Sequence, residues 1–446
     1  MADQKTTSQE SSSDAGRHSL YGSARLGLHE YWSFDFVARN EWSDAFSGSH
    51  LYPSVSGSID LKRAVPAFRG TTGALNGATL RAGWSQSGSN VTPYAISQIY
   101  TGNQPKDTVS LAPNLPVGSN TNLKPETTNA FEVRGNAQFF GSRLGVDVAV
   151  YNEQTSDLIL AVVSQSRAVP TNAGAVSNKG IEISVNATPF RAQHGAEWSV
   201  AMDYAKNSST VSSLIGGKQP LGPTRWGVGL EARNGQPLGV IVGTAFLRDQ
   251  SGQMILRDGH PLPDSVGGSR VLGSSQPSWS GGLTNTFRYW WLDMSVLFSA
   301  AMGGRVFSAS NMWGATSGVL AETSFRPDSG LLIAGIDAAT GNVNARHVTT
   351  EAYYHSLRAI TERWVYDASV IKLREARIGM TVPLRAVQGF RTQAIRVAFI
   401  GRNLLMWTKA PNIDPETALS TSSFQGLELG QLPTTRSVGF QITVTP

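Results

Sequence analysis

The strongest constraint on the fold is a two-residue alternation of apolar and polar side chains, which recurs in segments of about ten residues. In residues 181–188 the apolar side chains are Ile181, Ile183, Val185 and Ala187, and the intervening ones are polar or charged. This spacing gives a β-strand one apolar face and one polar face, and Gly, Asn, Ser and Pro bound the segments. About thirteen strands are predicted in this way, near residues 20–29, 32–42, 54–64, 78–87, 127–139, 143–155, 179–188, 197–208, 280–289, 291–301, 370–382, 394–403 and 435–444.

The connections between these strands alternate in length. Shorter turns are expected at residues 30–31, 65–77, 140–142, 189–196, 290 and 383–393, and long loops near residues 88–126, 156–178, 209–279, 302–369 and 404–434. Short turns at one end and long loops at the other are typical of an outer-membrane β-barrel, whereas a soluble sandwich rarely keeps such loops at one end only. One helix is expected inside a long loop, at residues 351–361.

Composition agrees with a membrane barrel. Of the 446 residues, 15% are charged and 40% are hydrophobic. A soluble protein with so few charges compensates with a larger apolar core, whereas a barrel lumen is filled by polar side chains and water. The net charge of +5 without a block of Lys and Arg argues against nucleic-acid binding, and the absence of cysteine excludes disulfides. No apolar run approaches the roughly 18 residues of a membrane helix.

Aromatic residues cluster at the ends of the predicted strands that lead into tight turns. Amphipathic rings suit a membrane–water boundary, although aromatic residues also favour strand ends and cores in general. The girdle interpretation is preferred for Tyr31, Trp32, Phe139, Phe140, Tyr289, Trp290 and Trp291.

The sequence contains no catalytic motif of the GxSxG, HExxH or P-loop type, and no enzyme activity or cofactor is predicted. Residues 249–252 and 337–342 resemble calcium loops only loosely, because the acidic repeat is missing, and they are expected to be β-turns. Charged residues on the polar strand faces are expected to line a lumen rather than form a catalytic acid pair. The lumen-facing candidates are Asp147, Glu182, Asp293, Arg377 and Arg396.

A series of short blocks follows in a fixed order, beginning with Asn-Leu-Lys-Pro-Glu at residues 122–126. The order and spacing of the blocks resemble the SusC/RagA branch of the TonB-dependent nutrient transporters, from about Ser19 to the end of the chain. Their residues are interpreted as structural: Pro125 marks a loop before a strand, Gly180 allows a turn into a strand, and Asn403 closes a strand into its loop. The signature residues are Asn122, Leu123, Lys124, Pro125, Glu126, Asn172, Gly174, Asn178, Lys179, Gly180, Glu182, Asn403, Asp414, Pro415 and Glu416.

The resemblance implies an all-β fold, the C-terminal portion of a transmembrane antiparallel barrel of the 22-strand type, at residues 19–446 behind a disordered polar N-terminus at residues 1–18. It also implies a location in the outer membrane of a Gram-negative cell, in contact with its lipids. The implied function is import of oligosaccharides or peptides with a SusD-like surface lipoprotein and energy from TonB. The loops at residues 209–279 and 302–369 would contact that lipoprotein.

Relatives of this type carry an N-terminal plug, the TonB-contacting segment and further strands, and the chain is expected to be truncated because residues 1–18 supply none of these and form no signal peptide. Such a chain alone is not expected to insert as a stable, gated transporter, because unpaired strand edges are costly in lipid. Two alternatives stay open. One is a passive porin-like barrel or surface adhesin, and the other is a soluble β-rich enzyme such as a glycan hydrolase.

Overall fold

The structure is a computed structural model. It describes residues 16–43, 48–69, 74–89, 120, 122–164, 167–192, 195–222, 224–264, 268–382, 394–417 and 425–445. Residues 1–15, most of the segment expected to be disordered, lie outside the described part, and the first strand begins at Arg17.

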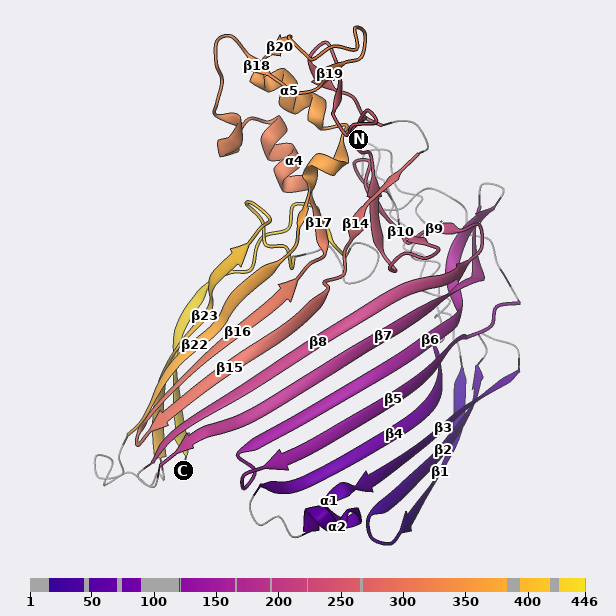
Figure 1. Cartoon of the computed structure of the whole chain (residues 1–446), viewed down its shortest axis with the longest axis vertical. Helices are drawn as coiled ribbons and strands as arrows, with labels where there is room; N and C mark the ends of the chain where they lie inside the picture. Colours follow the sequence, from indigo (N-terminus) through magenta and orange to yellow (C-terminus); the bar gives the residue numbers. More distant parts are fainter. Residues whose placement is uncertain are drawn as a thin grey trace, which may run out of the picture.

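One antiparallel sheet of thirteen strands dominates the molecule, and its strands follow one another in chain order. Figure 1 shows them running side by side at a tilt, as a wide curved wall. The strands are β1 (Arg17–Leu28), β2 (Trp32–Ser43), β3 (Ser49–Asp60), β4 (Leu75–Ser89), β5 (Glu126–Phe139), β6 (Leu144–Ser164), β7 (Arg167–Arg191), β8 (Ala196–Leu214), β15 (Trp279–Tyr289), β16 (Leu292–Met302), β22 (Val370–Val382), β23 (Ala394–Thr408) and β25 (Ser437–Thr445).

The predicted strands are confirmed in number, order and approximate bounds, and so is the long antiparallel sheet. The largest error is the loop predicted at residues 156–178. These residues extend β6 and β7, which stay paired as far as Ser164 and Arg167. The β6–β7 pairing shifts register between Thr155 and Leu158, with Asp157 at a φ of 58°, so the alternation that marks a strand in the sequence is interrupted there.

The alternation of apolar and polar side chains along each strand produces a sheet with two chemically different faces. Side chains that are paired across a ladder lie on the same face. One row across four strands contains Met294, Ile378, Phe399 and Phe440, which are 38%, 52%, 64% and 72% exposed. A second sheet would have buried these residues, so the apolar face is bare, as a surface in contact with lipid is.

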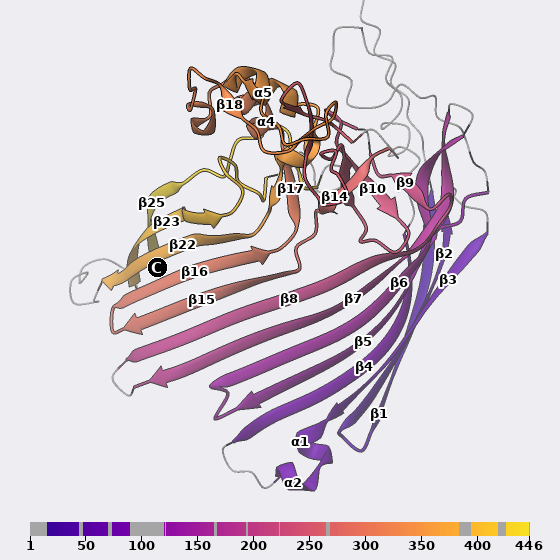
Figure 2. The same ribbon diagram turned by 45° about the horizontal axis from the view of Figure 1, so that its top comes forward.

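Two of the predicted long loops fold instead of remaining irregular. Together with the connection after β23, they form a compact unit at one end of the sheet (Figures 1 and 2), named here the loop domain: the described residues of 215–278, 303–369 and 409–436. Its strands are β9 (Lys218–Pro220), β10 (Gly229–Arg233), β11 (Val240–Gly243), β12 (Ile255–Arg257), β13 (His260–Pro261), β14 (Arg270–Ser274), β17 (Arg305–Ser308), β18 (Leu331–Leu332), β19 (Ile336–Asp337), β20 (His347–Val348), β21 (Val365–Asp367) and β24 (Leu427–Glu428).

The loop domain has a hydrophobic core of its own. Ile241, Met312, Leu357, Trp364 and Leu427 are all fully buried in one cluster. These residues come from all three connections, so the connections fold together as one unit. The core gives the loop domain the packing of a soluble domain, in contrast to the sheet below it.

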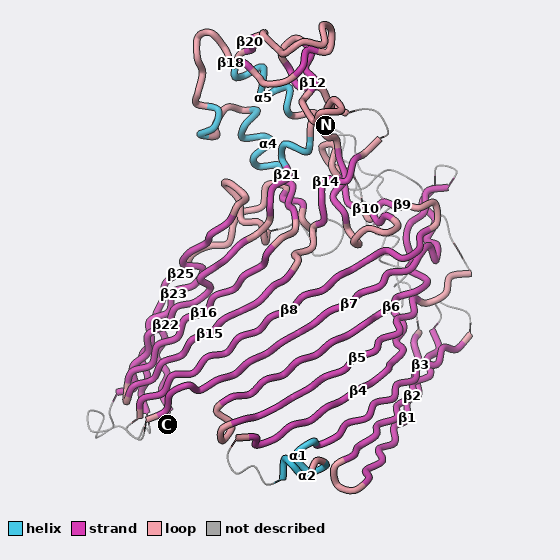
Figure 3. Tube along the Cα trace, in the orientation of Figure 1, coloured by secondary structure: helices cyan, strands magenta, loops and turns pink. Residues whose placement is uncertain are grey.

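Helices are few, as the cyan segments of Figure 3 show. The helix predicted at residues 351–361 is present as α5 (Thr350–Leu357), followed by the 3₁₀ helix η2 (Thr361–Trp364). Those that were not predicted are α1 (Leu61–Ala64), α2 (Pro66–Arg69), α4 (Ala309–Thr316) and the 3₁₀ helix η1 (Ala321–Thr323). No helix among the described residues is both long and apolar enough to cross a membrane.

Strand β3 ends at Asp60 rather than at residue 64, because Asp60 caps α1 by accepting a hydrogen bond from the backbone N–H of Arg63. Tight turns join the strands at this end of the sheet. Of the aromatic residues predicted for a girdle, Trp32, Phe140 and Trp290 lie at these turns and are 38%, 58% and 68% exposed. Their role at a membrane boundary stays a prediction.

Candidate functional site

The five charged residues predicted to face a lumen lie on the polar face of the sheet. The ladders pair Glu182 with Ala205, Ala205 with Ser280, and Ser280 with Ala301, so these four side chains share one face. Even steps along β16 lead from Ala301 to Asp293, which lies on that face too.

The other three candidates follow by the same pairing. Asp147 pairs with Ser184, two positions from Glu182. Asp293 pairs with Gly379, and Gly379 pairs with Ala398. Arg377 lies two positions before Gly379, and Arg396 lies two positions before Ala398. Both arginines therefore share the face of Asp293. A lumen lined by this face is the expected counterpart of the bare apolar face on the opposite side.

Ion pairs connect the charged side chains of the polar face. Arg396 pairs with Asp293 at 2.5 Å, and Arg134 lies 3.4 Å from Asp147. The side chain of Asp293 is only 12% exposed, and Arg396 reaches it across β22, which lies between their strands. Arg377 keeps its Nε buried with no hydrogen-bond partner among the described residues. Further pairs on this face are Arg25 with Asp35, Arg191 with Glu197, and Arg402 with Glu375.

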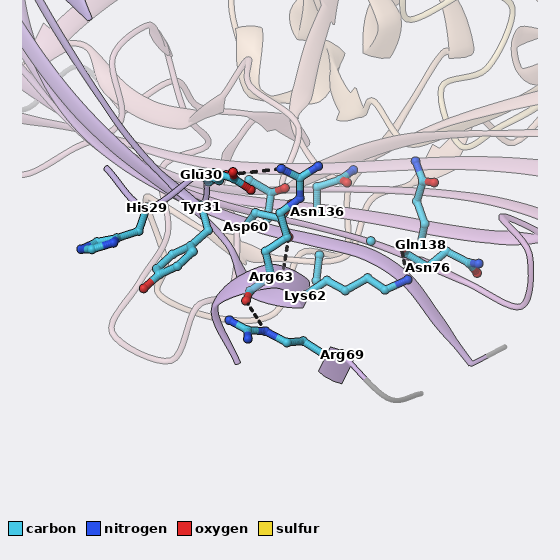
Figure 4. Close-up of a pocket in the computed structure, with 13 residues that line it drawn as sticks. His29, Glu30, Tyr31, Asp60, Lys62, Arg63, Arg69, Asn76, Asn136 and Gln138 are labelled. Carbon is cyan, nitrogen blue, oxygen red and sulfur yellow. Dashed lines mark hydrogen bonds and ion pairs between the residues drawn. The ribbon is translucent and has the colours of Figure 1, made fainter. Parts of the chain in front are cut away.

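A hollow of about 820 Å³ opens beside α1 and α2 at the tight-turn end of the sheet. Thr79, Asn136 and Gln138 line it from the polar face, and Figure 4 shows the long cationic side chains of α1 and α2 around it. Arg63 donates a hydrogen bond to the carbonyl of Glu30, and Arg69 donates one to the carbonyl of Arg63 at 2.7 Å. These contacts tie α1 to the turn between β1 and β2, and α2 to α1.

The Asn-Leu-Lys-Pro-Glu block is a structural tie. Asn172 Oδ1 accepts a hydrogen bond from the backbone N–H of Lys124 at 2.9 Å, and its Nδ2 donates to the carbonyls of Lys124 and Asp157, both at 2.8 Å. Glu126 accepts a hydrogen bond from the backbone N–H of Ile159 at 2.7 Å. Two signature blocks, 48 residues apart, are therefore joined by one asparagine side chain.

Replacing Asn172 by alanine is expected to destabilise this tie by about 1–3 kcal/mol, because the substitution removes three hydrogen bonds and leaves their backbone partners unpaired. The measurement is the rate of chymotryptic cleavage between Leu123 and Lys124 in the folded protein, which should rise. Asn178→Ala is the matched control, since Asn178 belongs to the same strand and its side chain makes no hydrogen bond among the described residues. Equal cleavage rates in the two variants would contradict the assigned role.

The two signature glycines of β7 make room for close neighbours. A Cβ at Gly180 would lie 2.3 Å from the phenol of Tyr151, its partner on β6, and one at Gly174 would lie 2.5 Å from the carbonyl oxygen of Ser213. Gly180 is in the interior of β7, so the predicted turn from loop into strand is wrong, and its role is close packing. Asn122, Leu123 and Pro125 precede β5, and Lys179 lies within β7.

The closing signature blocks meet in a buried ionic cluster. Lys372 on β22 reaches Asp414 at 2.6 Å and Glu416 at 2.6 Å, and its side chain is 2% exposed. Asp414 is fully buried and also accepts a hydrogen bond from the Thr434 hydroxyl at 2.6 Å. Pro415 lies between the two carboxylates in the chain. Asn403, at a φ of 51°, lies inside β23, which continues to Thr408, so the prediction that it closes a strand into its loop is wrong. It sits where the β22–β23 pairing shifts register, and its side chain donates to the carbonyl of Thr435.

The protonation of Asp414 follows from these contacts. Burial by itself raises its pKa, but hydrogen bonds from Lys372, Thr434 and the backbone N–H of Glu416 reverse that effect and hold the pKa below its usual value. The ionised carboxylate therefore fastens the connection after β23 to the barrel wall at neutral pH.

The loops that loosely resembled calcium sites are turns closed by their own aspartates. Asp249 accepts hydrogen bonds from the backbone N–H groups of Ser251 and Gln253, and Asp337 accepts from those of Ala339 and Thr340. The part of the chain that the structure describes holds no group of three or more His, Asp or Glu side chains placed for a metal ion.

Together, a tilted antiparallel wall, a bare apolar face and a charged opposite face define the wall of a membrane β-barrel. The sequence matches the family described as "TonB dependent receptor-like, beta-barrel" over residues 2–325. The chain belongs to this family, whose members are outer-membrane transporters rather than enzymes.

Curated relatives agree. The chain is 25% identical to "TonB-dependent receptor P3" of Formosa agariphila over 94% of its own length and 44% of the relative's. It is 24% identical to "TonB-dependent receptor SusC" of Bacteroides thetaiotaomicron over 45% of its own length and 21% of the relative's. The chain thus spans less than half the length of these relatives.

Solved structures show the same fold. The RagAB peptide importer in its open-open state superposes with a TM-score of 0.73 at 17% identity, over 97% of this chain and 47% of that one. The SusC/RagA resemblance predicted from the short blocks is thereby confirmed, as is the outer-membrane location.

Proposed function

We propose that the chain forms part of the barrel wall and the external loop domain of a SusC/RagA-type nutrient importer. Its cargo would be an oligosaccharide or a peptide, its energy would come through TonB, and a SusD-like lipoprotein would sit on the loop domain. Support comes from the family match and from likeness to both SusC and the RagAB importer.

One observation carries the proposal: the segregation of charge across a single layer of strands. Ion pairs such as Arg396 with Asp293 lie on one face, and the bare row through Phe399 lies on the other. Charged side chains on the lipid side would cost about 2–4 kcal/mol each for Arg or Lys near the bilayer centre. A wall of this kind separates lipid from a wet, polar path.

Deleting the coding segment from the chromosome, with the rest of its locus left in place, is expected to abolish uptake of the cargo. The measurement is accumulation of fluorescently labelled oligosaccharides and peptides by intact cells. Uptake in the parent strain should also stop when a proton uncoupler is added, because transport through TonB depends on energy. Uptake that resists the uncoupler would identify a passive porin and contradict energised import, and unchanged uptake after deletion would contradict transport itself.

A further inference from the structure

We propose that Trp226, Trp313 and Arg358 form a subsite of the loop domain that binds a pyranose ring of an oligosaccharide. The inference rests on the proposed import function and specifies its substrate class. These three residues are named here the aromatic corner. They come from the turn before β10, from α4, and from the residue that ends α5.

Trp226 occupies a strained backbone position at the tip of a two-residue turn. Arg225 and Val228 exchange backbone hydrogen bonds of 2.7 and 2.8 Å, and the residues between them, Trp226 and Gly227, have φ angles of 47° and 79°. Positive φ at both positions is the pattern of a type I′ turn, which strongly prefers Asn-Gly. A tryptophan in the left-handed region is disfavoured, and backbone strain of this kind concentrates at binding sites.

The strained turn brings Trp226 edge-on to a second indole. The centres of the Trp226 and Trp313 rings are 6.2 Å apart, their planes meet at 81°, and Trp226 is 41% exposed. The guanidinium of Arg358 lies 4.2 Å from the centre of the Trp313 ring. The corner therefore offers an open indole face, with a guanidinium held against the neighbouring ring.

In the part of the chain that the structure describes, no group accepts a hydrogen bond from the side-chain donors of the corner. Within the described residues, the guanidinium of Arg358 makes no hydrogen bond or ion pair, and neither indole N–H donates a hydrogen bond. Arginine and tryptophan are the residues that most often dominate binding surfaces. Three groups with free donors, gathered around an exposed aromatic face, suit a ligand with one apolar surface and several oxygen acceptors.

The platform beneath the corner is rigid, which lowers the entropic cost of binding. Ser308 caps α4 by accepting a hydrogen bond from the backbone N–H of Asn311 at 3.0 Å. Asn311 donates in turn to the carbonyl of Pro411 at 2.8 Å, which ties α4 to the third connection. Trp313 itself packs against the buried core of the loop domain.

A pyranose matches this arrangement better than a peptide does. Its C–H face can lie on the Trp226 indole, while its ring oxygen and hydroxyls accept hydrogen bonds from Arg358 and from the indole N–H of Trp313, whose ring is nearly perpendicular to that of Trp226. A peptide that binds by strand addition needs an exposed strand edge, and β10, which follows Trp226, is already paired on both sides by β9 and β11. A uronic acid would fit the same ring site and add a carboxylate for the guanidinium.

The test is calorimetric titration of the full chain in detergent micelles with maltohexaose, cellohexaose, an oligogalacturonate and a mixed hexapeptide pool. At least one oligosaccharide should bind, and Trp226→Asn should weaken that binding by about tenfold or more. Asparagine tolerates positive φ, so this variant removes the ring and keeps the turn. Arg358→Gln should weaken binding as well, most strongly if the ligand is the oligogalacturonate.

Phe325→Ala is the matched control, because Phe325 is a 70% exposed aromatic of the same domain outside the corner. The inference is overturned if none of the oligosaccharides binds, if Trp226→Asn binds as the parent does, or if only the peptides bind. Binding is measured without transport, so loss of import and loss of the subsite are separate results. Binding with no cellular uptake would contradict the import function and leave the subsite intact.

Discussion

Replacing Lys372 by methionine is expected to lower the free energy of unfolding by about 3–5 kcal/mol, the effect of removing one partner from a buried ion pair. The substitution leaves the carboxylate of Asp414 fully buried without its cation, although Thr434 still donates a hydrogen bond to it. The connection after β23 should also become more sensitive to protease, because Asp414 and Glu416 fasten it to β22 through Lys372.

Urea unfolding in detergent micelles measures the loss. Arg402→Gln is the matched control, because its pair with Glu375 is 62% and 32% exposed and should contribute only about 0–1 kcal/mol. The double variant Lys372→Met with Asp414→Asn should recover much of the stability, since no isolated charge stays buried. If Lys372→Met alone is no less stable than Arg402→Gln, the buried pair does not secure the connection.

The same cluster sets a dependence on pH. The pKa of Asp414 is lowered in the folded protein, so its contribution to stability is complete above its unfolded pKa of about 3.9 and is lost as pH falls through the folded value. Without Lys372, burial dominates and favours the protonated form of Asp414. As the pH falls, the difference in free energy of unfolding between the parent and the Lys372→Met variant should therefore become smaller. Parallel pH profiles for the two proteins would contradict this assignment.

Placing arginine at Phe399 is expected to cost about 2–4 kcal/mol and to reduce assembly into membranes, because the side chain points from the apolar face of β23 into hydrocarbon. Phe399 is 64% exposed and lies in a row with Ile378 and Phe440, which are exposed too. The measurement is the fraction of protein recovered in the outer membrane, together with its unfolding in detergent.

The neighbouring residue supplies the control. Ile400 is adjacent on β23 but pairs with Arg377, so its side chain lies on the polar face. Ile400→Arg adds the same charge at nearly the same depth and should assemble far better than Phe399→Arg. If both variants assemble equally well, or if Ile400→Arg is the worse one, the assignment of the two faces is wrong.

Much of the wall could be predicted from sequence because its strands are long and each has one polar face and one apolar face. Alternation such as that of Ile181, Ile183 and Val185 persists through each strand, and the structure places these residues on one face. The extension of β6 and β7 was missed because a bulge beside Asp157 breaks the alternation. A period of two is detectable only where the ladder is regular.

The loop domain could not be predicted in this way. Strand β11 (Val240–Gly243) is buried at all four positions, so it shows no alternation, and several other strands there have only two or three residues. Their stability comes from contacts between residues far apart in the chain. The pairing of Lys372 with Asp414 is equally invisible locally, since the two residues are separated by 42 positions and by the whole of β23.

The shared core of the loop domain limits how this protein can diversify. Ile241, Trp364 and Leu427 are contributed by separate stretches of chain, yet each is fully enclosed by the same cluster. A change of volume at one of them must be matched by the others, so recombination that exchanges a single stretch would leave a void or a clash. New external surfaces should therefore arise by concerted replacement of all three stretches, while the lipid-facing wall is inherited unchanged.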